Sequence, residues 1–299
     1  MRANAGLSAK NYREVNTVFP IVEKTVLNQD VVKIKVSAPL IAKKALPGQF
    51  IIFRVDEYGE RVPLTIADYD REGGTITLIF QLVGNSTKKL AQLEEGDSIL
   101  DLVGPLGVAT EIPEDVKSVC VIGGGVGCAI AYPQAKALFN QGYDVDVIAG
   151  FRNKDIVILE DEFKAASTNL YVCTDDGSYG TKGFVTNMLQ EQIDSGKKYD
   201  LVIAIGPIPM MKFVCKVTEP YAIKTLVSLN PVMIDGTGMC GGCRVTVGGK
   251  IKYACVDGPD FDGHQVDFDE LMRRNGTYRE QEHECRMMKQ ADKLQQTDK

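Results

Sequence analysis

The chain has 299 residues, 44% hydrophobic and 25% charged, which is the composition of a globular protein large enough for two domains and a small appendage. Its net charge of -6, without any Lys/Arg-rich block among aromatic residues, argues against nucleic acid as a partner. We find no signal-like apolar stretch at the start and no run of about 18 apolar residues that would suit a membrane helix. These features predict a cytoplasmic protein without a membrane partner.

Short alternating segments predict an antiparallel β-barrel or sandwich in the first part of the chain. One short helix is expected at residues 88–93, capped by Ser86 or Thr87. We assign residues 17–110 to this β domain and residues 1–16 to a leader that precedes it. The predicted strands are residues 31–36, 49–55, 75–80 and 98–103.

Apolar strands alternate with helical stretches in the middle of the chain, which is the pattern of a parallel α/β sheet with helices on both faces. We place this domain at residues 111–229. The glycine-rich segment 230–266 is too short for its own core, so something other than apolar burial is expected to hold it. The charged tail 267–299 is expected to be a helix on a partner or partly disordered. The predicted strands of the α/β domain are residues 118–125, 144–150, 169–176 and 200–206.

The strongest chemical signal is the set Asp235, Cys240, Cys243 and Cys255. Its spacing matches the plant-type iron-sulfur pattern C-x4-C-x2-C...C, with an aspartate in the first position. A carboxylate is an anion at neutral pH and can ligate iron, although it is a harder ligand than a thiolate. The alternative is a structural zinc site made by the three thiolates with His264 or another donor.

The other cysteines lie mostly in apolar strand or helix context, where inert core thiols are expected. The chain holds only two histidines, His264 and His283, so no Ser-His-Asp or Cys-His arrangement can be argued and no catalytic side chain is predicted. The core thiols are Cys120, Cys128, Cys173, Cys215 and Cys285.

A glycine-rich turn follows the first strand of the α/β domain and precedes a helix, where it can hold a dinucleotide pyrophosphate. Cys128 stands where a third fingerprint glycine belongs, and Arg152 follows the next strand instead of an acidic residue. A purely structural turn is the alternative. Later strand ends carry further turn residues on the same edge of the sheet. The candidate nucleotide residues are Gly124, Gly125, Val126, Gly127, Arg152, Asp175, Asp176, Gly177, Gly206 and Pro207.

A third candidate site lies in the β domain. Arg61 can pair with a pyrophosphate, the extended backbone at Pro63 and Thr65 can bond a flat ring, and Ser86 and Thr87 offer hydroxyls at a helix start. Alone, this is an ordinary strand-and-turn pattern. The residues concerned are Arg61, Val62, Pro63, Leu64, Thr65, Ile79, Phe80, Gln81, Gly84, Ser86 and Thr87.

In chain order, these three signals resemble the ferredoxin-NADP reductase superfamily, in the branch that holds the electron-transfer subunit of dihydroorotate dehydrogenase. The resemblance runs from about Phe19 to Phe268. Within the branch, Asp235 and the stretch CVDGPDFDGHQVDFDELMRR resemble small subunits of electron-bifurcating NADH-dependent ferredoxin:NADP+ oxidoreductases, whereas dihydroorotate-type subunits would carry cysteine in place of the aspartate. The motifs that carry the resemblance are RVPLT, VGNST, GGGVG, CTDDGSYGTKG, GPIPMM and the cysteine loop.

The resemblance implies a β-barrel FAD domain, an α/β parallel-sheet nucleotide domain for NAD(H) and a small C-terminal [2Fe-2S] loop. It also implies a larger flavoprotein partner with FAD and [4Fe-4S] clusters, and ferredoxin as a partner through the complex. FAD would be bound by residues 61–65 and 79–81 and by Ser86 and Thr87. One departure is that Val62 holds the position of the family's flavin arginine.

Two other interpretations stay open at this point. The chain can be the electron-transfer subunit of an NAD-dependent dihydroorotate dehydrogenase, which has the same chemistry and a different partner. It can also be a zinc-stapled nucleotide-binding scaffold without redox activity. The choice between NADH and NADPH is open as well, because Arg152 and Lys154 can accommodate a 2′-phosphate.

Overall fold

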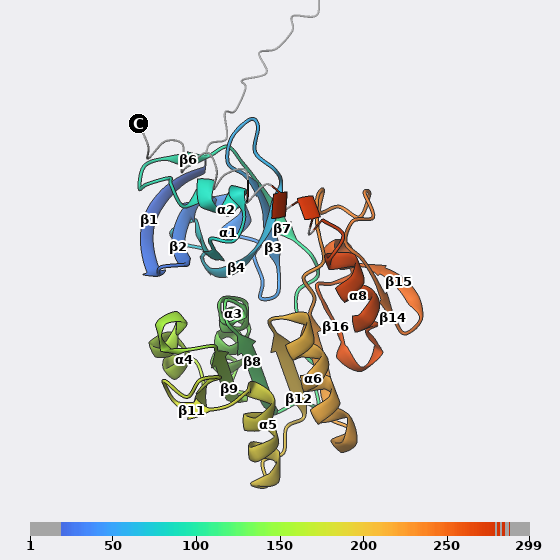
Figure 1. Ribbon diagram of the computed structural model, residues 1–299. Coiled ribbons are helices and arrows are strands. Elements are labelled where there is room, and N and C mark those ends of the chain that lie inside the picture. Colours follow the sequence, from blue (N-terminus) through green and yellow to red (C-terminus); the bar gives the residue numbers. More distant parts are fainter. Residues whose placement is uncertain (1–18, 279, 282, 285–286, 288–299) are drawn as a thin grey trace, which may run out of the picture.

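The computed structural model describes residues 19–278, 280–281, 283–284 and 287. The predicted leader, residues 1–16, Cys285 and about half of the charged tail 267–299 lie outside the described residues. Figure 1 shows a β-barrel above an α/β domain, with a small C-terminal module beside both. No helix among the described residues is long and apolar enough to cross a membrane.

The first unit is a seven-stranded antiparallel sheet that curls into a nearly closed barrel, in the order β6-β1-β2-β5-β4-β3-β7. Alternating side chains such as Ile34, Phe53, Ile66 and Leu78 are almost fully buried in it, because successive residues of a strand face opposite sides. The predicted barrel is confirmed, although β1 and β4 were not among the strands we expected. The strands are β1 Phe19–Asn28, β2 Val31–Ser37, β3 Phe50–Arg54, β4 Val62–Asp70, β5 Thr75–Gln81, β6 Ser98–Ile99 and β7 Asp101–Leu106.

The barrel segment contains two short helices, although only one was predicted. Helix α1, Pro39–Ala42, starts at a proline, which suits the first turn of a helix. Helix α2, Asn85–Leu90, begins three residues before the predicted start because Gly84 is its N-cap. Thr87 Oγ1 accepts a hydrogen bond from the Gly84 amide at 3.2 Å, so Thr87 supports the first turn from inside the helix.

The second unit is a parallel sheet in the order β11-β10-β9-β8-β12-β13-β16, with only β16 antiparallel to its neighbour. The four predicted strands are present, with ends that differ by at most two residues. Strand β16 comes from the segment that we assigned to the cysteine loop, so that segment returns to the α/β sheet. The strands are β8 Ser118–Gly124, β9 Asp144–Phe151, β10 Asn169–Thr174, β11 Thr181–Lys182, β12 Leu201–Ile205, β13 Lys224–Ser228 and β16 Asp260–Asp262.

Helices cover both faces of this sheet. The α-helices are α3 Gly127–Asn140, α4 Glu160–Ala165, α5 Val185–Asp194 and α6 Ile208–Thr218, and the 3-10 turns are η1 Lys154–Ile156, η2 Glu219–Tyr221 and η3 Gly263–Gln265. Helix α3 also contacts the barrel, where Lys136 Nζ lies 2.7 Å from Asp68 Oδ2 of β4. The barrel and the α/β domain are therefore directly packed together.

The C-terminal module consists of a hairpin and two helices. Its apolar side chains, including Val245, Phe268 and Leu271, belong to one buried cluster with Val214 of α6 and Phe50 of β3. The expectation that something other than apolar burial must hold this segment is wrong, because it uses the core of its neighbours. The elements are β14 Arg244–Val247, β15 Lys250–Tyr253, α7 Ala254–Asp257 and α8 Phe268–Asn275.

Candidate functional site

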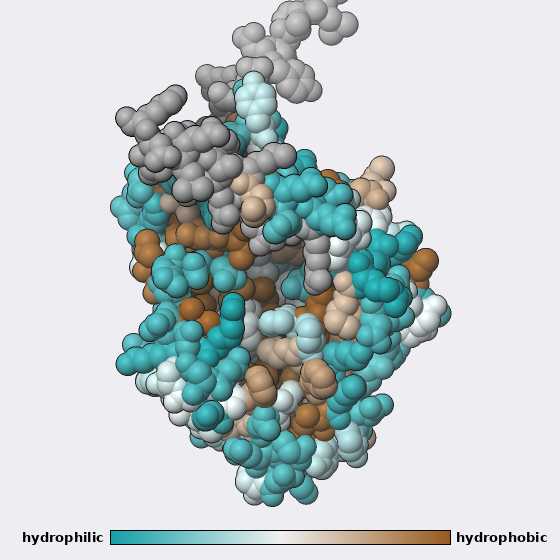
Figure 2. All heavy atoms as spheres, viewed as in Figure 1, coloured by the Kyte–Doolittle hydropathy of each residue, from teal (hydrophilic) through white to brown (hydrophobic). Residues whose placement is uncertain are grey.

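A cleft of about 880 Å³ lies between the barrel and the carboxyl ends of the parallel strands. Figure 2 shows the recess between the two units, with apolar side chains in its walls. The barrel contributes Gln29, Asp30 and Val31 at the β1–β2 turn, and Gln81 at the end of β5. Ligands of open α/β sheets bind at this edge, so the cleft has the position of a nucleotide site.

The glycine-rich turn forms one wall of the cleft between β8 and α3. Gly125 has a left-handed φ of 56°, which glycine adopts without strain. A side chain at Gly127 would overlap the carbonyl oxygen of Ile205 and lie 2.8 Å from Gly206 Cα. The start of α3 therefore sits directly on the end of β12, and its first-turn amides can face an anion in the cleft.

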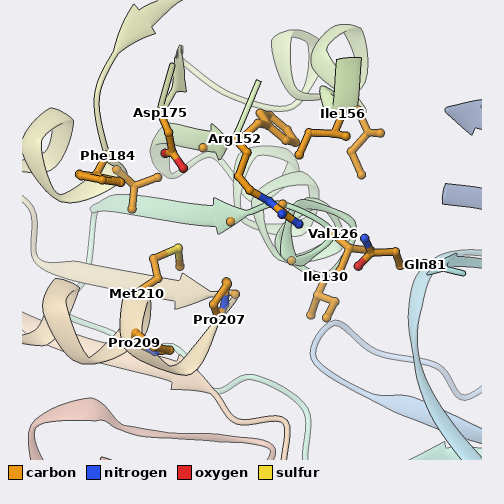
Figure 3. A pocket seen from close by; sticks show the side chains of 18 of the residues that line it. Gln81, Val126, Ile130, Arg152, Ile156, Asp175, Phe184, Pro207, Pro209 and Met210 are labelled. Atoms are coloured by element: carbon orange, nitrogen blue, oxygen red, sulfur yellow. The ribbon is translucent and has the colours of Figure 1, made fainter. Parts of the chain in front are cut away.

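Eight of the ten predicted nucleotide residues line the cleft. In Figure 3 the side chain of Arg152 extends from the end of β9 into the cleft, toward the turn with Val126. The two exceptions are Asp176 and Gly177. Asp176 Oδ1 accepts hydrogen bonds from the amide and hydroxyl of Ser178 at 2.9 and 2.7 Å, and the Ser178 hydroxyl is the main cause that lowers the pKa of that carboxyl. The residues in the cleft are Gly124, Gly125, Val126, Gly127, Arg152, Asp175, Gly206 and Pro207.

Sequence reasoning missed the apolar part of the lining. Phe184 precedes α5 and Phe213 lies on α6, and both rings are more than half exposed in the cleft wall. Met210 and Pro209 line the same cleft (Figure 3). Pro209 and Met210 belong to the motif GPIPMM, whereas Phe184 and Phe213 lie in no recognised motif. An exposed phenylalanine next to a nucleotide turn suits contact with a flat ring.

The predicted flavin segments meet at one end of the barrel. Strand β4 starts with Val62, Pro63, Leu64 and Thr65, and the antiparallel β5 ends with Ile79, Phe80 and Gln81, so the two segments are neighbours. The third segment joins them, because Ser86 Oγ lies 3.3 Å from Glu60 Oε2. Gln81 faces the cleft, whereas Ile79 and Phe80 are buried. Arg61 is exposed before β4, and the Thr87 hydroxyl is engaged with Gly84.

The four predicted metal ligands form two touching pairs. Cys240 Sγ donates to Asp235 Oδ1 at 3.1 Å, and the Cys243 and Cys255 sulfurs lie 3.2 Å apart, too far for a disulfide. Among the described residues, no three His, Cys, Asp or Glu side chains converge as ligands of one metal ion. His264 is not placed with the cysteines, since its Nε2 lies 3.0 Å from Thr218 Oγ1 on α6.

The two pairs differ in environment. Cys240 is exposed, whereas Cys243 and Cys255 are buried. The Cys240 thiol holds the pKa of the Asp235 carboxyl well below its usual range, so Asp235 is an anion at neutral pH. Burial raises the pKa of Cys255 to about 12, with a further contribution from Cys243. Metal binding here requires that the thiols release their protons.

Four of the five thiols that we predicted to be inert are buried in the α/β domain, and the fifth, Cys285, lies outside the described residues. Burial is the main cause of a raised pKa in each of the four. For Cys173 the pKa is raised to about 11 and for Cys215 to about 12. A thiol in that state is a poor nucleophile.

Two family models match the chain. The oxidoreductase NAD-binding domain covers residues 121–216, and the iron-sulfur cluster binding domain of dihydroorotate dehydrogenase B covers residues 230–267. A Thermotoga maritima protein named as a homolog of the dihydroorotate dehydrogenase B (NAD(+)) electron transfer subunit is 48% identical over 88% of this chain and 92% of its own length. The chain belongs to the family of these electron transfer subunits.

Other members of the electron transfer subunit family, and solved structures, agree with this assignment. The named electron transfer subunit of Fusobacterium nucleatum is 32% identical over 83% of this chain and 97% of its own length. A chain of the NADH-dependent reduced ferredoxin-NADP oxidoreductase structure, described for flavin-based electron bifurcation, superimposes with a TM-score of 0.84, at 47% identity over 89% of this chain and 95% of that one.

More distant structures share the fold alone. The cytochrome b5 reductase domain of Ulva prolifera nitrate reductase is 18% identical, with a TM-score of 0.57 over 70% of this chain and 95% of that one. Within its family the chain is an oxidoreductase subunit with an NAD-binding domain and an iron-sulfur-binding domain. The predicted fold class and family are confirmed.

Proposed function

We propose that this chain is the electron-transfer subunit of a flavin-based electron-bifurcating NADH-dependent ferredoxin:NADP+ oxidoreductase, with FAD and a [2Fe-2S] cluster as its cofactors. It exchanges hydride with NAD(H) and passes single electrons to a larger flavoprotein subunit with FAD and [4Fe-4S] clusters, and ferredoxin takes part through the complex. The complex is cytoplasmic. The likeness to the electron-bifurcation structure at 47% identity supports this proposal.

The position of Gly236 carries the proposal. This residue follows Asp235, has a φ of 76°, and lies so close to the barrel that a side chain would meet Leu106 at 2.9 Å and overlap Ile52. Ile52 is paired in register with Pro63, inside the predicted flavin segment. The cysteine loop therefore abuts the strands that would hold the flavin, and the same end of the barrel faces the nucleotide cleft.

The pairing of the ligands supports [2Fe-2S] rather than zinc. A structural zinc ion needs four donors around one point, whereas the two irons of a [2Fe-2S] cluster each take two protein ligands. Asp235 with Cys240, and Cys243 with Cys255, supply two such pairs of donors. Thiolate and carboxylate donors suit iron, and the hard carboxylate would shift the potential of its iron.

In this proposal the protein itself binds and orients the flavin and NAD(H). Bound flavin supplies the exchange between hydride and single-electron transfer. The turn at Gly127 receives the NAD(H) pyrophosphate, and Arg152 offers a cation beside it. Phe184 and Phe213 cover the apolar end of the cleft and exclude water from it. No acidic or basic side chain is needed for this chemistry.

The names of the curated relatives favour a second candidate, the electron-transfer subunit of an NAD-dependent dihydroorotate dehydrogenase. Asp235 argues for the first candidate, because the dihydroorotate-type subunits would carry cysteine there. Affinity purification from the native host decides between them. A large flavoprotein partner with [4Fe-4S] clusters supports the first candidate, and a dihydroorotate-oxidising partner supports the second.

The cofactors are tested on anaerobically purified chain, wild type beside Asp235→Cys. Flavin absorbance, about two irons per chain, and altered visible and EPR signals in the variant are expected. Asp269→Cys is the control, because it places a cysteine at an exposed position of α8, where Asp269 pairs with Lys212 and is not a predicted ligand. Zinc without flavin, or equal signals from both variants and wild type, would overturn the assignment.

A further inference from the structure

Three parts of the chain meet at one carboxyl group behind the nucleotide cleft, that of Asp260 on β16. Thr110, on the segment that leaves the barrel, donates its hydroxyl to Asp260 Oδ2 at 2.5 Å. Gln134 of α3 donates Nε2–H to the same oxygen at 3.2 Å. The hydroxyl of Ser228, at the end of β13, is a further partner of this carboxyl. The barrel, the helix of the glycine-rich turn and the edge of the sheet are thus joined at one group.

The second oxygen of this carboxyl has no partner. Asp260 Oδ1 and Gln134 Oε1 are both buried and both without a hydrogen bond, among only four such side-chain atoms in the described residues. Both oxygens are acceptors in the usual forms of the two side chains, and they belong to groups already joined by one hydrogen bond. A single additional donor between the two groups would satisfy both.

We propose that Asp260 is a neutral carboxylic acid in the folded protein and positions the α/β domain against the barrel through an acid–amide pair with Gln134. In this pair the acid O–H at Oδ1 donates to Gln134 Oε1, and Gln134 Nε2–H donates to Oδ2. The convergence of the donors on Oδ2 marks that atom as the carbonyl oxygen, and leaves Oδ1 as the hydroxyl.

The alternative is an ionised Asp260, because hydrogen bonds to Oδ2 favour a carboxylate. The groups that face the carboxyl are Thr110 after the barrel, Gln134 on α3, Ser228 on β13 and Gly48 before β3. None of them carries a charge, so within the described part of the chain no cation among these neighbours compensates a buried anion. Burial is accordingly the largest influence and raises the pKa of Asp260.

The location explains why this pair matters for the cleft. Ser228 and Asn230 line the cleft, and Gln134 lies on the helix that starts with the glycine-rich turn at Gly127. Asp260 is not among the residues that line the cleft, so it is a positioning residue. It fixes the turn and the end of β13 relative to the barrel, and its effect on NADH turnover rests on the proposed function.

The protonation state is tested by isotope-edited infrared spectroscopy of the cofactor-loaded chain near neutral pH. The carbonyl band of a protonated carboxylic acid is expected in wild type and absent in Asp260→Asn. Asp262→Asn is the matched control on the same strand, since the Asp262 carboxylate is half exposed and accepts from the His264 amide. The absence of an acid band that depends on Asp260 would overturn the proposal.

The positioning role is tested by NAD+ binding and by NADH turnover. Asp260→Asn keeps a paired amide and should bind NAD+ within about twofold of wild type, whereas Asp260→Ala should weaken binding about tenfold or more and raise the KM for NADH with kcat little changed. Gln134→Met should match Asp260→Ala, which covers the case that the alanine variant fails to fold. Equal affinity in wild type and Gln134→Met would overturn the role.

The infrared band and NAD+ binding do not depend on the partner subunit, so they can succeed where the proposed function fails.

Discussion

Gly127→Ala should damage the nucleotide cleft with little effect elsewhere. The added Cβ would lie 2.8 Å from Gly206 Cα, against an ordinary contact of 3.4 Å or more, and would overlap the Ile205 carbonyl. Both obstacles are backbone atoms, so the start of α3 must move by at least ~0.6 Å (3.4 minus 2.8), at a cost of about 1–3 kcal/mol. Because the shifted amides are those proposed to face the pyrophosphate, we expect the Kd for NAD+ to rise about tenfold for each 1.4 kcal/mol lost.

The control for this variant lies at the other end of the same helix. Gly142 has a φ of 88° and open space around its Cβ position, so Gly142→Ala costs about 1–2 kcal/mol of stability through backbone strain alone. Calorimetric titration with NAD+ and thermal unfolding are compared for the two variants. If Gly127→Ala loses stability and keeps the wild-type affinity, as Gly142→Ala should, the turn is structural and does not bind the dinucleotide.

Three further predictions concern the burial of polar groups and thiols. Asp146, whose side chain is 1% exposed, accepts from three donors, so Asp146→Ala should lower the free energy of unfolding by about 3–5 kcal/mol; an unchanged urea midpoint would contradict this. Burial raises the pKa of Asp260 in the folded protein. The contribution of its carboxyl group to stability is therefore complete below the pKa of the unfolded chain, about 4, and is lost as the pH rises toward the pKa in the folded protein. Wild type should therefore lose up to about 1.4 kcal/mol per pH unit relative to Asp260→Asn, and parallel curves would refute the raised pKa. In cluster-free protein a thiol reagent should modify Cys240 rapidly and Cys120 only on unfolding; fast labelling of Cys120, seen by peptide mapping, would show that the core opens.

The sequence predicts the parallel strands well because they are buried on both faces and read as continuous apolar runs. Strand β4 was missed because Pro63 looks like a turn residue, although it sits near the start of the strand, opposite Ile52. Strand β16 is three residues long, and only Phe261 is buried in it. Its place at the sheet edge depends on β13, far away in the chain, and no local pattern encodes that contact.

The candidate site shows the same difference between local sequence patterns and contacts that join distant parts of the chain. The glycine-rich turn and the cysteine spacing are local patterns that report backbone shape and ligand chemistry, so both could be recognised in advance. Asp176 shows what such local patterns cannot predict. It follows Asp175, which lines the cleft, but its own carboxylate accepts a hydrogen bond from the Ser178 amide within the turn and does not line the cleft. Phe184 and Phe213 come from separate helical segments, and only the folded chain brings them to one wall.

The C-terminal module shows why the cluster loop cannot be regarded as a separate appendage. Its hairpin and α8 share a core with α6, and β16 extends the nucleotide sheet. The Val108 amide donates to Gly258 O at 2.7 Å, which ties the module to the segment that leaves the barrel. Because the module has no core of its own, the ligand loop can hold a fixed position only while both neighbours are folded. The placement of the proposed cluster ligands relative to the cleft is therefore a property of the whole chain, and a fragment from residue 230 onward should fold neither with nor without iron.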